Sequence, residues 1–398
     1  MRAILFSSLS VLAACAGRQS TGTTPAPEPE VRQLEPMRIT ARRTEGGELE
    51  MGAYDAEMLF RQANDHLDGG RCDQAVPLYD RVADEFPDSR FVSPALYNAG
   101  LCLMEGDELA GAAARFERLL RETPTSGDVQ HTRFQLAQVY LGLERWEDAL
   151  AQAETLLHED DLTPDERVEA MARAAQAHLG AGQQREAAER ARSALAYART
   201  RPEDDRVRQI YHLAAANFVY AETLRIRAEA VELPEGGVAV QRPVLERRAQ
   251  LILAAQREYF DTMRHTHPHW AAAAGYRIGE MYDHFWEAIT TAPVPPPSRE
   301  MTEEERAIYD EEYRLSLARL VKPLIRHSIR YWELTLLMVE RTGVNTEWRE
   351  KIEEDLARAR ERLLEQPDGP EGIDAVDRSR SGSTGDRGGE GSAAQDAG

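Results

Sequence analysis

The chain has 398 residues and a formal net charge of −21, with 48 Lys and Arg against 69 Asp and Glu. This acidic balance excludes a general attraction to the phosphate backbone of nucleic acids and to anionic lipid headgroups. The three cysteines are too few for a disulfide framework. A composition rich in Ala, Leu, Glu and Arg, with only 7% aromatic residues, favours an all-α fold.

The first fourteen residues have the pattern of a bacterial signal peptide. A single arginine precedes the apolar stretch 3–12, which is too short to span a bilayer because a span takes about 20 apolar residues. Residues 12–15, Leu-Ala-Ala-Cys, resemble the lipobox of bacterial lipoproteins. The resemblance implies cleavage before Cys15 and lipid on its thiol, and Ala16 in the next position favours the outer membrane. The alternative is an ordinary secretory signal followed by a chance cysteine.

Two segments without helical periodicity flank the region that we expect to fold. After the anchor residue, the interval 15–52 is rich in Thr, Pro, Gly and Glu, which predicts a flexible linker kept extended by its negative charge. Residues 367–398 contain mostly Gly, Ser, Asp and Arg and are predicted to form a disordered tail. Between these segments we expect helical regions over 53–201 and 202–366.

An internal repeat organises the first helical region. Small residues recur at steps of 37, 37 and 38 residues, at Ala75, Ala112, Ala149 and Ala187. A second set of small residues lies twelve positions earlier, at Ala63, Gly100, Ala137 and Ala175. Such positions are typical of two helices that approach closely. Pro87 and Pro124 stop the second helix of the first two units.

This pattern resembles the tetratricopeptide repeat, a helix-turn-helix unit of 34 residues with small residues at its eighth and twentieth positions. The step here is three or four residues longer, as in periplasmic members of the family. The resemblance extends over 56–198 and is strongest over 56–122. It implies an all-α solenoid with about four repeats in 53–201.

Longer helices are predicted beyond Pro202. We expect helices over 204–232 and 243–265, separated by a Gly-Gly loop at 236–237. The run Tyr-Arg-Ile-Gly at 276–279 echoes the run Tyr-Asn-Ala-Gly in the second repeat, which indicates that the solenoid continues with stretched helices.

Local signals also mark the last helices. A proline-rich break at 292–297 precedes Thr302 and Glu305, whose spacing is that of a capping box. A long helix therefore begins there, and Gly343 is predicted to end it. Residues 345–365 are expected to form an amphipathic helix that caps the solenoid.

Cys72 and Cys102 admit two interpretations. An exported chain enters an oxidising compartment, where thiols can pair. The repeat geometry implied by the resemblance places both cysteines toward the same edge of packed helices, which favours a disulfide. The alternative is two separate buried cysteines.

The resemblance also implies a concave groove, lined by the second, fifth and ninth positions of each unit. Aromatic rings beside amides at these positions suit an extended peptide. The candidate groove residues are Phe60, Asn64, Tyr97, Leu101, Phe134, Gln138 and Gln176. The alternative is that the rings only pack against their neighbours. Because no Lys or Arg occupies these positions, we do not expect a clamp for a C-terminal carboxylate.

Motifs for catalysis are missing from the sequence: there is no Gly-rich phosphate loop, GxSxG elbow or HExxH. The only concentrated group of ligand-type residues is His265, His267 and His269, and no nearby carboxylate or cysteine completes a metal shell. We therefore predict no catalytic residue, metal, cofactor or small-molecule substrate. A metal-binding or enzymatic protein based on these histidines is the alternative.

These features predict a scaffold held in the outer membrane by lipid on Cys15 and facing the periplasm. Its expected partners are envelope proteins or peptides bound by the concave surface, with no nucleic acid. The resemblance suggests β-barrel assembly, coordination of the cell wall and division, or motility and secretion machinery as settings. Exposure on the cell surface is the alternative location.

Overall fold

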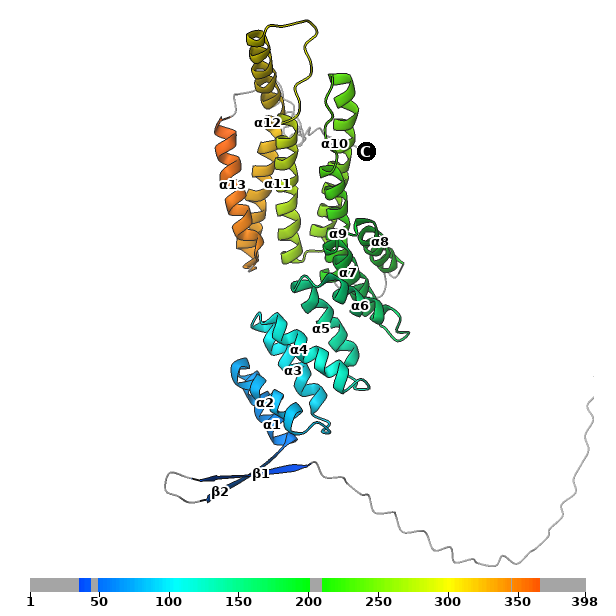
Figure 1. Cartoon of the computed structure of the whole chain (residues 1–398), viewed down its shortest axis with the longest axis vertical. Coiled ribbons are helices and arrows are strands. Elements are labelled where there is room, and N and C mark those ends of the chain that lie inside the picture. The colour runs from blue at the N-terminus through cyan, green and yellow to red at the C-terminus, as the bar shows by residue number, and fades with distance from the viewer. Residues whose placement is uncertain (1–35, 44–48, 201–209, 345, 366–398) are drawn as a thin grey trace, which may run out of the picture. The chain divides into compact units, whose positions relative to one another are not determined.

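The computed structural model describes residues 36–43, 49–200, 210–344 and 346–365. Figure 1 labels the helices and strands in chain order. The chain divides into two compact units, Met1–Ala56 and Glu57–Gly398. The predicted signal peptide 1–14, the predicted lipid site Cys15 and the predicted tail 367–398 lie outside the described residues.

The first unit contains an antiparallel hairpin in a stretch where the sequence predicts a flexible linker. Strand β1 (Met37–Arg43) pairs along its whole length with β2 (Leu49–Asp55). The linker prediction is therefore wrong for this stretch. Met37, Ile39 and Ala41 alternate with polar residues, which is the two-residue period of a strand and escapes a search for helical periodicity.

The repeat region consists of short helices joined by tight turns. They are α1 (Ala56–Asp68), α2 (Cys72–Glu85), α3 (Val92–Glu105), α4 (Leu109–Glu122), α5 (Val129–Gly142), α6 (Trp146–Leu157), α7 (Pro164–Gly180) and α8 (Gln184–Arg199). From α2 onward each helix packs against the next, and α7 also contacts α5. Pro87 and Pro124 each lie two residues beyond a helix end, as predicted.

The small residues of the repeat lie where helices meet. Ala63, Ala137 and Ala175 are completely buried. A Cβ at Gly100 would lie 2.4 Å from the Phe116 ring, so only glycine leaves room for that ring. The period seen in the sequence is therefore the spacing of close helix contacts.

Longer helices form the rest of the described chain, as predicted. They are α9 (Ile210–Glu229), α10 (Val238–Arg264), α11 (Pro268–Thr290), α12 (Glu303–Thr342) and α13 (Trp348–Glu365). Helix α10 starts five residues earlier than predicted and contains Pro243. The missing N–H of this proline leaves the carbonyl of Ala239 without its helical partner, and because Ala239 is exposed, this carbonyl is open to solvent.

The repeat-like run at 276–279 has the same packing role as its counterpart in the repeats. A Cβ at Gly279 would lie 2.3 Å from Nε1 of Trp332. The Trp332 indole N–H donates a hydrogen bond of 3.0 Å to the carbonyl of Tyr276. An indole in α12 thus occupies the space that a side chain at Gly279 would need.

The predicted ends of α12 are confirmed. Thr302 Oγ1 accepts a hydrogen bond from the Glu305 N–H at 3.3 Å, and the Glu305 carboxylate accepts one from the Thr302 N–H at 2.9 Å. Gly343 ends the helix with a left-handed φ of 64°. Among the described helices, none is both long and apolar enough to cross a membrane.

Candidate functional site

The seven candidate groove residues lie on first helices of the repeats. They are Phe60 and Asn64 in α1, Tyr97 and Leu101 in α3, Phe134 and Gln138 in α5, and Gln176 in α7. We call the surface made by α1, α3, α5, α7 and α9 the A face. Gln138 is exposed, whereas Phe134 is only 4% exposed. Phe134 therefore offers a ligand little contact, and the other five are half-buried.

The aromatic rings of the A face pack against rings of their own repeat and of the following one. The Phe60 ring lies 5.7 Å from the ring of Tyr79 and 5.2 Å from that of Phe91. The Tyr97 ring lies 6.0 Å from that of Phe116. These contacts give the rings a packing role, and only their half-exposed edges remain for a ligand.

Two amides of the A face also have internal partners. Asn64 Oδ1 accepts a hydrogen bond of 2.6 Å from the Tyr79 hydroxyl. Gln138 Oε1 accepts one of 3.1 Å from Nη2 of Arg173, which links α5 to α7. Each amide still has its NH₂ group, which can donate to a backbone carbonyl.

Arg173 is a site residue that the sequence analysis missed. It stands one position after the fifth in its unit, and its side chain is 8% exposed between α5 and α9. Its guanidinium pairs with the Glu169 carboxylate at 2.6 Å. Arg173 thus brings a cation to the A face from a position outside the second, fifth and ninth, and Glu169 neutralises its charge.

Glu169 connects α7 to α9. Its Oε2 lies 3.3 Å from Nε2 of His212. Burial alone would raise the pKa of Glu169, but the hydrogen bond with His212 and the charge of Arg173 outweigh burial and hold this pKa at about 2. Gln138, Arg173, Glu169 and His212 thus form one polar row across three first helices.

Unpartnered nitrogen atoms gather around Tyr211 at the end of this row. The Tyr211 ring lies 5.0 Å from the ring of His212, 4.9 Å from that of His267 and 5.6 Å from that of Trp270. His212 Nδ1, His267 Nδ1 and Trp270 Nε1 are buried and have no hydrogen-bonding partner within the described chain. Such atoms are rare in folded proteins, because desolvation without a partner costs free energy.

The three clustered histidines have separate surroundings. His265 Nε2 lies 2.7 Å from Nδ2 of Asn217, and the His269 ring packs 5.0 Å from that of Trp270. Burial lowers the pKa of His265, His267 and His269. Within the described ranges, no three His, Cys, Asp or Glu side chains are placed to hold a metal ion.

A family comparison identifies the repeats. Residues 60–127 match the family described as tetratricopeptide repeat. Residues 60–127 therefore contain tetratricopeptide repeats. No curated protein sequence matches the chain.

Solved structures similar to this tetratricopeptide-repeat chain share little sequence with it. A tetratricopeptide repeat protein from Parabacteroides merdae is 14% identical, covering 76% of this chain and 98% of that chain with a TM-score of 0.37. MamA from Desulfovibrio magneticus is 17% identical over 51% and 94%, with a TM-score of 0.34. YrrB, a repeat protein with an unusual peptide-binding site, is 19% identical over 50% and 86%, also with a TM-score of 0.34. Scores this low support no argument about function.

The first two tetratricopeptide repeats are joined covalently. Cys72 at the start of α2 and Cys102 near the end of α3 form a disulfide, with their Cα atoms 5.3 Å apart. Of the two interpretations of these cysteines, the structure contains the bonded one. The bond ties the second helix of the first repeat to the first helix of the second repeat.

Proposed function

We propose that this protein is a membrane-anchored, non-enzymatic scaffold that binds an extended peptide of a cell-envelope protein on its A face. Tetratricopeptide repeats form protein-binding scaffolds. The observation that carries the proposal is the end of the A face around Tyr211, where three buried nitrogen atoms lack partners among the residues that the structure describes. A peptide backbone has alternating donors and acceptors, so it can pair with the NH₂ group of the exposed Gln138, and it can satisfy the three nitrogen atoms once the side chains that cover them rotate aside.

The anchoring part of the proposal rests on the lipobox-like residues that end at Cys15. Lipid on this residue would hold the chain in the outer membrane, with the repeats in the periplasm. The Cys72–Cys102 disulfide supports this location because such bonds persist in oxidising compartments. The settings proposed are barrel assembly, coordination of the cell wall and division, or motility and secretion machinery.

Site-specific photocrosslinking in cells tests the binding surface. A photoreactive residue replaces Gln138, which is exposed on the A face. The matched control replaces Gln74, an exposed glutamine on the second helix α2. We expect crosslinks to one or a few envelope proteins from position 138 and none from position 74. Equal crosslinking from both positions would contradict binding of the partner on the A face.

The anchor is tested separately. Cys15→Ser should abolish incorporation of a clickable fatty acid and release the protein from the membrane fraction. Protease treatment of intact cells then distinguishes the periplasm from the cell surface, because only a surface-exposed chain is digested. Retention of Cys15→Ser in membranes without label would contradict lipid anchoring and leave the A-face test unaffected.

A further inference from the structure

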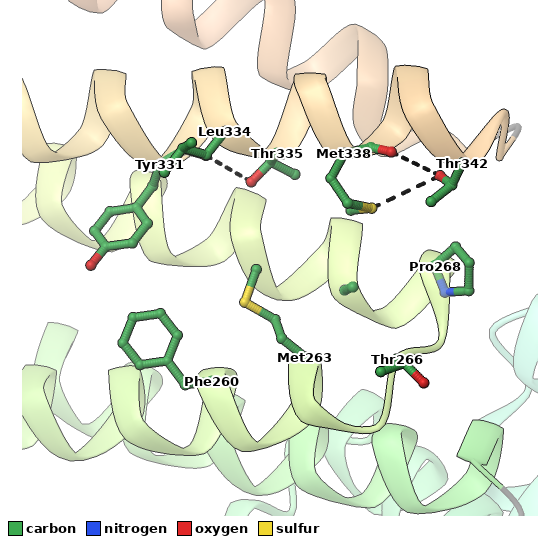
Figure 2. A pocket seen from close by; sticks show the side chains of 10 residues that line it. Phe260, Met263, Thr266, Pro268, Tyr331, Leu334, Thr335, Met338 and Thr342 are labelled. Atoms are coloured by element: carbon green, nitrogen blue, oxygen red, sulfur yellow. Dashed lines mark hydrogen bonds between the residues drawn. The ribbon is translucent and has the colours of Figure 1, made fainter.

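A groove with a volume of about 410 Å³ lies on the long-helix region, far along the chain from the repeats. Figure 2 shows Phe260 and Met263 of α10 along one side and Leu334 and Met338 of α12 along the other. The start of α11, from Pro268, lies between them. We call this surface the α10–α12 groove.

The lining of the α10–α12 groove is apolar, and no charged side chain contributes to it. The hydroxyls of its two α12 threonines are occupied: Thr335 donates to the Tyr331 carbonyl at 2.7 Å, and Thr342 donates to the Met338 carbonyl at 2.9 Å. Leu334 is nevertheless 53% exposed. A ligand in the groove must therefore present apolar groups to it.

One end of the groove is held at a defined width. Nε2 of Gln256 in α10 donates a hydrogen bond of 2.9 Å to the Tyr331 hydroxyl in α12. The ring of Phe260 lies 6.1 Å from that of Tyr331. The groove therefore exists without a ligand, and binding needs little rearrangement.

Exposed arginines border the groove although the chain as a whole is acidic. Arg257 lies one helical turn before Phe260, Arg330 one turn before Leu334, and Arg341 one turn after Met338. In the part of the chain that the structure describes, these three form no ion pair.

The other charges along these helices are paired or lie on another side. Arg264 pairs with Asp261, and Glu333 pairs with Arg360 at 2.7 Å. Glu333 and Glu340 fall nearly opposite the lining positions of α12, at 3.6 residues per turn. The edge of the groove is therefore basic.

We propose that the α10–α12 groove binds an acidic amphipathic helix of a partner protein. The lining positions from Tyr331 to Thr342 span about 16 Å, or three helical turns. This length accommodates apolar anchors at positions i, i+4 and i+7 of a docked helix. The flexible thioethers of Met263 and Met338 fit anchors of different shape, and carboxylates beside the anchors pair with the bordering arginines.

The charge of the partner helix follows from the charge of this chain. At −21, the chain repels acidic proteins in general, so the three arginines that border the apolar groove select where such a helix docks. The groove is formed mainly by α10 and α12, which are not helices of the A face, and it shares the start of α11 with the residues around Tyr211.

A synthetic helix tests the proposal on the full chain. The probe is a fluorescent 16-residue peptide with leucines along one face and glutamates beside them. Two control peptides have the same leucines dispersed around the helix, or lysines in place of the glutamates. We expect saturable one-to-one binding of the probe by fluorescence anisotropy, weakened by salt, and little binding of either control.

Paired variants locate the binding site. Leu334→Glu in the groove should weaken binding of the probe by about tenfold or more. Leu320→Glu, which changes an exposed leucine of α12 outside the lining, should leave it unchanged. Arg257→Glu combined with Arg330→Glu should weaken binding and reduce its dependence on salt.

Three results would overturn the proposal. They are equal binding to the Leu334→Glu and Leu320→Glu variants, binding of the lysine peptide as strong as that of the probe, and failure of the probe to bind at all. A fluorescent fatty acid that saturates the wild-type groove, is lost in Leu334→Glu and is not displaced by the probe would instead assign the groove to lipid.

Discussion

The repeats α1–α8 and the long helices α9–α13 differ in how their buried residues are connected. In the repeats, the apolar core consists of several small clusters, each shared by a few neighbouring helices. In the long helices, one cluster extends from Ala214 to Ala359 and includes four tryptophans. The repeats therefore resemble a series of similar interfaces, whereas the long helices share one core.

Buried charge follows the same division. In the long helices, the Glu222 carboxylate is 5% exposed and pairs with Arg225 at 2.9 Å and Arg277 at 3.4 Å. These groups join α9 to α11, and the hydroxyl of Tyr259 in α10 donates to the same carboxylate. In the repeats, the Arg115–Asp80 pair is more exposed and joins only α2 to α4, and the buried Arg173–Glu169 pair lies at the boundary with α9. Damage to the long helices should consequently spread farther than damage to a repeat.

The largest effect is expected from truncating a buried ring in each region. Trp332→Ala should cost about 4 kcal/mol of unfolding free energy, because it leaves a cavity and removes the indole hydrogen bond to the Tyr276 carbonyl. Phe116→Ala should cost about 3 kcal/mol. Hydrogen exchange should accelerate throughout α9–α13 in the first variant and mainly in α3–α5 in the second. Uniform acceleration over the whole chain in both would refute the difference between the regions.

Removal of the disulfide should affect the repeats alone. Cys72→Ser combined with Cys102→Ser should lower the unfolding free energy of the first repeats by about 3 kcal/mol, because the bond closes a loop with a sequence separation of 30. Urea unfolding monitored by hydrogen exchange resolves the two regions. An unchanged wild-type mass after denaturing alkylation without reductant would support the bond, and uptake of label at both cysteines would contradict it.

Lowering the pH should destabilise both regions through one carboxylate in each. The pKa of Glu169 and that of Glu229 are both held at about 2. For Glu229, burial raises the pKa, but His284 and Arg225 outweigh it. Because the folded pKa lies below the unfolded one, each carboxylate stabilises the fold above about pH 4.5. This contribution, about 2–3 kcal/mol each, is lost as the pH falls toward 2.

Glutamine variants assign this acid sensitivity. Glu169→Gln should flatten the dependence of repeat stability on pH between 5 and 3, and Glu229→Gln should do so for the long helices. Chemical denaturation at pH 6, 4 and 3 measures both. A slope that persists in both variants would assign the effect to other carboxyl groups.

The raised pKa of His284, caused mainly by its bond to Glu229, has the opposite effect on stability. It stabilises the fold below about pH 6.5.

The smallest effect is expected at two capping boxes, one in each region. Thr163→Ala removes the cap of α7, and Thr302→Ala removes that of α12. Each change should cost about 1 kcal/mol. Most of the first two turns of α12 is exposed, so Thr302→Ala should fray those turns with little change in global stability. A global loss larger than that of Thr163→Ala would show that the start of α12 is coupled to the shared core.

Most of the fold could be predicted from the sequence because its signals are local. The spacing of Ala75 and Ala112, the capping box at Thr302 and the stop at Gly343 depend on residues within a turn or a repeat. The hairpin β1–β2 escaped prediction because its period is two rather than 3.6. The extra turn of α10 before Pro243 also escaped prediction. The carbonyl that this proline leaves unpaired belongs to an exposed residue, so the helix can continue through the proline.

Less of the candidate site could be predicted. The helices that carry it were identified, but Phe134 proved to be buried and Arg173 was missed. Exposure and pairing of these side chains depend on neighbouring units. Arg173 meets Gln138 across a sequence separation of 35 residues, and no spacing rule within one unit reveals that contact.

The sequence alone thus determined which segments are helices and where they approach, since helix periodicity, caps and small residues act over short distances along the chain. Tertiary structure alone decided which polar groups lie together on the A face, and it alone formed the α10–α12 groove. Gln256 and Tyr331, which set the width of that groove, are 75 residues apart. Their contact exists only because a continuous core aligns α10 with α12, and that alignment is the sum of many weak packing interactions.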